Sequence, residues 1–352
     1  MNLLTIAISY NFGYNVVDGG SHHGGKMKKF LVLIVSALLL LSGCGSQGDG
    51  EPVVTSKAYK VGTGIVTTVA TTDATAEALG TVSVNTTYAW IVLDADGVIV
   101  YAKIDQVQNN KATFDNTGAV VDQVYKASKA QLMDEYGMVG ASPIGKEWYQ
   151  QIAFMQDWMI GKNINDVLAT ELADGYATDA DLLTGTTISI SDFIAAVADA
   201  NTKLVDVNDI ISVGADTYTT ASFAAGKIEF DTNSALVALD VDGNVLYTNI
   251  DAVQSKIAFD ETGVVTAATS NSKKALGGEY GMVGASGIGK EWYQQAAAFE
   301  TWTVGKSIDA VVTTELADGY ATDADLLTGT TIKISDIIAS VDAANKAVVT
   351  LS

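Results

Sequence analysis

Residues 181–187 read Asp-Leu-Leu-Thr-Gly-Thr-Thr, and the same seven residues return at 325–331. The identity extends outward from this stretch, because residues 170–188 and 314–332 agree at every position. A constant offset of 144 positions relates the two copies of this block. Self-similarity at a fixed period indicates a duplicated structural unit. The sequence therefore predicts two tandem copies of one domain, each carrying this motif.

The rest of the chain divides into five parts around the two motifs. We expect an untranslated or non-structural leader at 1–26, a signal peptide at 27–43 and a polar, flexible tether at 44–57. The two homologous domains are expected at 58–203 and 204–352. A chain of 352 residues with 48% hydrophobic residues is long and apolar enough for two such cores.

The segment after Met27 has the order of a bacterial lipoprotein signal. Lys28 and Lys29 precede an apolar run over 30–41, which is too short to span a bilayer comfortably, and Leu-Ser-Gly-Cys ends at Cys44. This ending resembles the lipobox, in which the cysteine becomes the lipidated first residue of the mature protein. The resemblance implies a lipid anchor at Cys44 and a location on the extracellular face of the cell membrane.

Each copy begins with sequence typical of β-strands. Asp-Ala-Asp-Gly at 94–97 lies between two β-rich runs, and Asp-Val-Asp-Gly at 240–243 does the same in the second copy. Asp-Gly tolerates the positive φ of tight turns, so both stretches predict β-hairpins. A calcium loop is the alternative, but the later ligands and the closing Glu of an EF-hand are missing.

The second part of each copy is expected to be mainly helical. In the first copy we predict helices over 146–160, 164–170 and 192–201, with Ser191 as the N-cap of the last. Residues 187–190 alternate like a short strand, so the motif is expected where a loop enters a strand. The fold class is then α+β, with an antiparallel sheet followed by helices in each copy.

Composition excludes several classes of function. The net charge of −21 argues against nucleic acid as a partner, and the chain contains no arginine. The only histidines are His22 and His23, and the only cysteine is Cys44. Disulfides, haem attachment, His- or Cys-ligated metal and His-dependent catalysis are therefore not expected, and no catalytic residue set is proposed. Redox chemistry would need an organic cofactor.

A glycine-rich stretch in each copy has the spacing of a phosphate-binding P-loop. It covers 140–146 in the first copy and 284–290 in the second, and each ends on a lysine. A P-loop places Ser or Thr next to hold magnesium, whereas here the next residues are Glu147 and Glu291. A carboxylate at that position would repel phosphates, so nucleotide hydrolysis is not expected.

Aromatic residues and a lysine flank the same glycines. Such a set suits an isoalloxazine ring, which needs flat apolar faces and donors near its pyrimidine edge. The alternative is that the tryptophans anchor the core. The residues are Tyr136, Lys146 and Trp148 in the first copy and Tyr280, Lys290 and Trp292 in the second.

The pattern Asp-x-x-Thr-Gly-x-Thr resembles the acceptor site of covalently flavinylated FMN-binding domains. The resemblance implies that a flavin transferase esterifies Thr187 and Thr331 with the phosphate of FMN. That family usually has alanine before the acceptor, where this chain has Thr186 and Thr330. Either hydroxyl of each Thr-Thr pair is therefore a candidate acceptor. The remaining motif residues are implied to help form the cofactor site; they are Asp181, Thr184 and Gly185 with Asp325, Thr328 and Gly329.

The arrangement of lipobox, tether and two motif-bearing domains resembles the doubly flavinylated lipoproteins of Gram-positive extracellular electron transfer. This implies an electron-transfer flavoprotein rather than a self-sufficient enzyme. Electrons would come from a membrane NADH dehydrogenase through the quinone pool and leave to extracellular acceptors such as ferric iron. A non-redox surface lipoprotein that binds a ligand or a cell-wall component is the alternative, since the tether and the acidity fit both.

Overall fold

The computed structural model describes residues 56–351. The expected leader, the signal peptide, Cys44 and nearly all of the tether lie outside the described residues. Contacts within the chain place these described residues in a single compact unit. In the part that the structure describes, no helix is long and apolar enough to cross a membrane.

Two antiparallel sheets form the centre of this unit. The first has the order β5-β4-β2-β1-β8, with β3 also paired to β2, and the second has the order β12-β11-β10-β9-β15. The strands of the first sheet are β1 (Ala58–Thr72), β2 (Gly80–Asp94), β3 (Ile99–Asn109), β4 (Thr113–Phe114), β5 (Val120–Asp122) and β8 (Val205–Asn208). Those of the second are β9 (Ser212–Ala224), β10 (Lys227–Leu239), β11 (Val245–Phe259), β12 (Val265–Ser272) and β15 (Val349–Thr350). Two small ribbons pair β6 (Leu172–Ala173) with β7 (Tyr176–Ala177) and β13 (Leu316–Ala317) with β14 (Tyr320–Ala321).

Equivalent sets of helices follow the long strands of each sheet. The first set is α1 (Lys129–Leu132), α2 (Trp148–Met159), α3 (Ile164–Leu168), α4 (Ala180–Leu183) and α5 (Ser191–Asn201). The second set is α6 (Lys273–Leu276), α7 (Trp292–Thr303), α8 (Ile308–Val312), α9 (Ala324–Leu327) and α10 (Ser335–Lys346). Short 3-10 turns are η1 (Met133–Tyr136), η2 (Val139–Ala141) and η3 (Gly277–Tyr280). This mixture of antiparallel sheets and helices confirms the α+β fold class.

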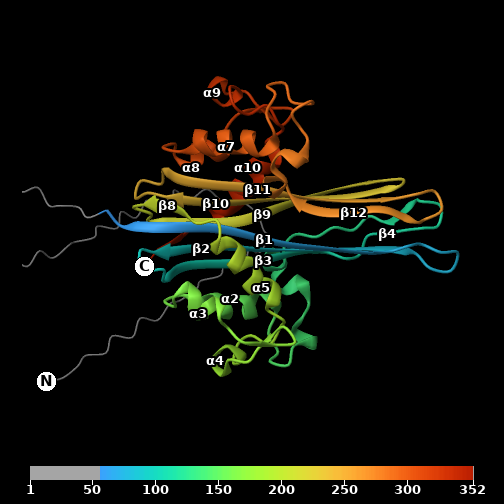
Figure 1. Ribbon diagram of the computed structural model, residues 1–352, viewed down its shortest axis with the longest axis horizontal. Coiled ribbons are helices and arrows are strands. Elements are labelled where there is room, and N and C mark those ends of the chain that lie inside the picture. The colour runs from blue at the N-terminus through green and yellow to red at the C-terminus, as the bar shows by residue number, and fades with distance from the viewer. Residues whose placement is uncertain (1–55, 352) are drawn as a thin grey trace, which may run out of the picture. The chain divides into compact units, whose positions relative to one another are not determined.

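The sheets lie between two layers of helices (Figure 1). Alternate residues of β2 explain the layering, because successive side chains of a strand point to opposite faces. Ile91 and Leu93 pack in the core under α2 and α5, whereas Trp90 packs against Leu236 and Ala238 of the second sheet. Both faces of the strand are therefore buried, and the two sheets share one apolar core.

The predicted hairpins are confirmed. β2 pairs antiparallel with β3, and β10 with β11. In the first turn Asp94 Oδ1 accepts the backbone N–H groups of Asp96 and Val98, and Gly97 has a φ of +79°. One carboxylate oxygen of Asp94 thus accepts hydrogen bonds from the protein's own backbone within the turn.

Helix α5 lies very close to β1. A Cβ atom added to Gly64 would be 1.9 Å from the carbonyl oxygen of Ala196, which no real structure could accept. The second sheet repeats this contact, with an added Cβ on Gly214 only 2.0 Å from the carbonyl oxygen of Ala344. Glycine at these two strand positions thus allows the helix that follows each motif to lie this close to the sheet.

The structure corrects two local expectations. Residues 187–190 do not form a strand. The N–H of Thr187 binds a glutamine side chain and that of Ile190 binds the carbonyl of Gly175, so neither is free for a strand ladder. Ser191 is the first residue of α5 and not its cap, which is Ile190. The predicted helices over 146–160, 164–170 and 192–201 are confirmed: the first two are shorter than predicted by two or three residues, and the third begins one residue earlier.

Candidate functional site

The first motif begins as a single helical turn. Asp179 caps α4 by accepting the N–H of Leu182 at 2.8 Å, and the hydroxyl of Thr184 donates to the carbonyl of Asp181 at 2.7 Å. Asp181 and Thr184 are exposed. Thr328 and Asp325 repeat the same hydrogen bond at the end of α9. These residues therefore terminate the helix and present the aspartate to solvent.

The glycine of each motif packs directly on the preceding long helix. A Cβ on Gly185 would be 2.2 Å from the ring of Phe154 on α2, and one on Gly329 would be 2.6 Å from the Cβ of Ala298 on α7. The close neighbour is thus a side chain of the same helical layer. The glycine lets the threonine pair lie against that helix.

One glutamine holds both threonines of the first motif. The hydroxyl of Thr186 donates to the carbonyl of Gln151 at 2.8 Å, and the N–H and hydroxyl of Thr187 reach Gln151 Oε1 at 2.8 and 3.2 Å. Gln151 Nε2 in turn donates to Ser142 Oγ at 3.0 Å and to the carbonyl of Lys146 at 3.3 Å. Gln151 therefore joins the motif to the glycine-rich loop.

The second motif has the same connections. Gln295 accepts from Thr330 at 2.8 Å and from the N–H and hydroxyl of Thr331 at 2.8 and 3.2 Å. Its Nε2 donates to Ser286 at 3.0 Å and to the carbonyl of Lys290 at 3.2 Å. Two sites built from the same contacts are thus present in one chain.

Burial separates the two hydroxyls of each pair. Thr186 is 1% exposed and Thr330 is fully buried, and each donates its hydroxyl to a main-chain carbonyl. Thr187 and Thr331 are only half-buried. The second threonine of each pair is therefore more accessible to an incoming group than the first.

The glycine-rich loop is folded around a glutamate of its own chain. Glu147 accepts the backbone N–H groups of Met138 and Val139 at 2.8 and 2.9 Å. These bonds hold the pKa of the Glu147 carboxyl below its usual value. Glu291 makes the equivalent bonds to Met282 and Val283. A protein carboxylate thus takes the backbone donors of the two residues that precede each glycine-rich stretch.

A cavity of about 310 Å³ lies beside the first motif. Ile188 and Ser189, the two residues after Thr187, form part of its wall. The other lining residues combine aromatic and apolar groups with amides and a lysine. They are Asn85, Gln106, Gln108, Lys129, Tyr136, Met138, Trp148, Asp192 and Phe193.

Lys129 is the cationic group of this cavity. Its Nζ lies 4.8 Å from the ring centre of Tyr136 and 5.5 Å from that of Trp148, and the residue is only 7% exposed. Burial lowers the pKa of its ammonium to about 8, although the carboxylate of Asp105 opposes that shift. Lys146 is not part of the lining; its Nζ lies 5.5 Å from the ring of Phe154.

Lys129 and its counterpart Lys273 were not identified from the sequence as site residues. A signal was present, because Ser-Lys occurs at 128–129 and again at 272–273 with the same offset of 144. Lysine is usually a surface residue, so this repeat alone did not indicate burial against aromatic rings. Tyr136 and Trp148 were identified, and the structure brings both to the cavity.

The first cavity fits a flat heteroaromatic ring with polar edges. Trp148, Met138 and Phe193 supply apolar wall, and Lys129 supplies a donor. Asn85 Oδ1 is a buried acceptor without a hydrogen-bond partner among the described residues. Buried polar atoms are normally paired, so a ligand N–H meeting this oxygen would remove an unfavourable feature.

The second site has the same aromatic pair but a different opening. Lys273 Nζ lies 5.5 Å from the ring centre of Tyr280 and 5.6 Å from that of Trp292. The nearby cavity, of about 320 Å³, is lined by Tyr280 and Met282 but extends over Thr269 and Asn271 of β12. Lys273 and Trp292 are not in its lining.

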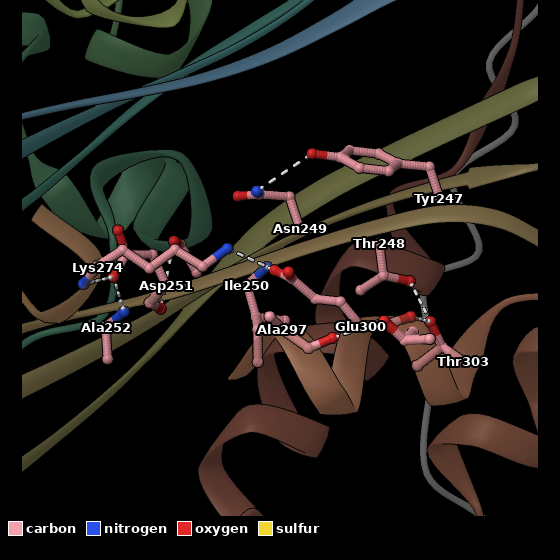
Figure 2. A network of polar contacts seen from close by, with 12 residues as sticks. Tyr247, Thr248, Asn249, Ile250, Asp251, Ala252, Lys274, Ala297, Glu300 and Thr303 are labelled. Atoms are coloured by element: carbon pink, nitrogen blue, oxygen red, sulfur yellow. Dashed lines mark hydrogen bonds and ion pairs between the residues drawn. The ribbon is translucent and has the colours of Figure 1, made fainter. Parts of the chain in front are cut away.

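A buried aspartate lies behind each lysine. Asp105 accepts the N–H groups of Gln106 and Ala130 at 2.7 and 3.1 Å. In the second sheet Asp251 is held by Ala252, Ser272 and the N–H of Lys274, and Lys274 forms an ion pair with Glu300 at 2.5 Å (Figure 2). Burial raises the pKa of both aspartates, that of Asp105 to about 6.

Replacing Asp105 by asparagine should change how stability depends on pH. A carboxyl whose pKa is higher in the folded than in the unfolded state stabilises the fold at low pH and loses this contribution as pH rises. For Asp105 the loss falls between about pH 4 and pH 6 and amounts to about 3 kcal/mol. The free energy of unfolding, measured with urea, should therefore rise in Asp105→Asn relative to the wild type by about this amount between pH 4 and pH 7. Parallel curves would show that Asp105 titrates normally.

Residues 56–351 contain no group of three or more His, Cys, Asp or Glu side chains that could hold a metal ion. Comparisons of the chain with protein-family models, with curated proteins and with solved structures each gave no match.

Proposed function

We propose that the protein is a membrane-anchored, extracellular electron carrier with FMN linked by phosphoester to Thr187 and Thr331. The observation that supports this most is the repeated glutamine contact. In both halves the hydroxyl of a half-buried threonine donates to a buried glutamine. In the first half the two residues after that threonine line a cavity together with an aromatic pair and a lysine. When bound, the flavin would supply the electron transfer.

The chain's own residues would bind and orient the ring. Trp148 and Met138 give it apolar surface, Asn85 Oδ1 accepts a ring N–H, and Lys129 places positive charge beside it. A covalent link needs no strong phosphate clamp, which agrees with a chain that lacks arginine. Partners in this proposal are a flavin transferase, a membrane NADH dehydrogenase with its quinone pool, and extracellular acceptors such as ferric iron.

Intact mass spectrometry of the chain made with and without an active flavin transferase tests this function. We expect two FMN-sized increments only with the transferase, and a yellow colour that persists after denaturation. Cells with the flavinylated protein should reduce ferric iron faster than cells without it. As a control, the transferase must be shown to modify its own substrate. If this chain gains no mass beside such an active transferase, the proposal is excluded and a non-redox, ligand-binding lipoprotein is favoured.

A further inference from the structure

The two sites differ at one strand position next to the aromatic lysine. Asn85 on β2 is paired with Gln108 on β3, and Asp231 on β10 is paired with Gln254 on β11. Gln108 and Gln254 line the two cavities. Asn85 and Asp231 therefore hold equivalent places, and the first is a neutral amide where the second is a carboxylate.

This difference changes the charge of the lysine's surroundings. Lys273 Nζ lies 3.6 Å from Asp231 Oδ1, and the two side chains are only 13% and 27% exposed. Lys129 makes no ion pair within 4.0 Å among the described residues. Opposite charges this close and this poorly solvated largely cancel each other's field. The ammonium thus has a carboxylate within 4.0 Å in the second site and none that close in the first.

The other nearby charges do not produce the same contrast. Asp105 and Asp192 beside Lys129 are matched by an aspartate at each equivalent position of the second half, 251 and 336. Glu229 lies near Asp231, but its carboxylate pairs with Lys227. Of the additional lysines of the second site, Lys256 lines the cavity, but it and Lys333 are exposed, where solvent and salt screen them. Lys274 is neutralised by its ion pair with Glu300.

We infer that the first site holds its flavin at a more positive reduction potential than the second. This inference rests on the proposed function. Reduction adds negative charge to the ring, and an ammonium without a close counter-charge stabilises that charge more than an ion-paired ammonium does. At equilibrium, electrons lost by a reduced second site are gained by an oxidised first site, and no bond is made or broken. Electrons would therefore collect in the half nearer the N-terminus of the sequence.

Singly loaded proteins give the direct test. Thr331→Ala leaves only the first site to be loaded and Thr187→Ala only the second, so a redox titration of each reports one site. We expect the more positive midpoint in Thr331→Ala. Adding Asp231→Asn to Thr187→Ala should raise its midpoint, and adding Asn85→Asp to Thr331→Ala should lower its midpoint. Equal or reversed midpoints would overturn the inference while leaving the proposed function intact.

The flavin-free protein separates the two proposals. The pKa of Lys129, followed by NMR of its ε-carbon, should start near 8 and rise in Asn85→Asp, because a carboxylate then faces the ammonium. Asn165→Asp adds the same charge on an exposed residue of α3 and should leave the pKa unchanged. If no flavin attaches, the proposed function fails and this measurement still decides the electrostatic difference. An unchanged pKa in Asn85→Asp would refute it.

Discussion

Thr187→Ala, made beside a flavin transferase, should carry one FMN instead of two, and Thr187→Ala combined with Thr331→Ala should carry none. A phosphoester needs a hydroxyl, and the half-buried hydroxyl at this position is the one that an outside enzyme can reach. Intact mass gives the count, and peptide mapping gives the position. The double variant should still fold, because each lost hydroxyl makes one hydrogen bond at 3.2 Å.

Thr186→Ala is the matched control. Its hydroxyl is buried and donates to the carbonyl of Gln151, so we expect both flavins to remain and stability to fall by about 1 kcal/mol. A loss of flavin in Thr186→Ala with retention in Thr187→Ala would move the acceptor to the buried threonine. That result would also require the motif to leave α2 before modification.

Gly64→Ala should prevent normal folding or destabilise the protein by about 3 kcal/mol or more. The new Cβ would stand 1.9 Å from the carbonyl oxygen of Ala196 and 2.5 Å from the backbone nitrogen of Ala200. Both neighbours are main-chain atoms of α5, so relief requires the whole helix to move away from β1. Urea unfolding followed by circular dichroism measures the loss.

Gly140→Ala makes the same chemical change where the structure has room. Gly140 lies in η2 with no atom within 4 Å of an added Cβ, and its φ is not positive. Its stability should stay within about 0.5 kcal/mol of the wild type. Similar losses in both variants would show that the close contact between α5 and β1 is not what makes the glycine necessary.

Much of the local structure could be predicted because the signals were local. Asp-Gly turns predicted the hairpins, and apolar spacing predicted the helix that begins at Trp148. The strand predicted after Thr187 was wrong because the alternation of apolar and polar residues does not show which groups hydrogen-bond to the backbone. A side chain 36 positions away, Gln151, takes the N–H of Thr187. The periodicity of a sequence segment does not reveal hydrogen bonds to side chains that lie far away in the chain.

The candidate site was only partly predictable for the same reason. Tyr136 and Trp148 could be chosen from their place beside glycines, and both line the cavity. Lys146 was chosen because it ends the glycine-rich stretch, but the lysine against the aromatic rings comes from α1. Asn85 comes from β2, far back in the chain. Only the folded sheet brings these elements together.

The core shared by the two sheets has a consequence for how the chain can be divided. Trp90 and Tyr88 of one sheet are covered by Leu236 and Ala238 of the other, so separating the halves would expose a broad apolar face on each. A fragment ending near residue 208 should be insoluble or should pair with a second copy of itself. The two halves thus resemble the subunits of a homodimer joined in one polypeptide, and removing either half would leave the apolar face of the other uncovered.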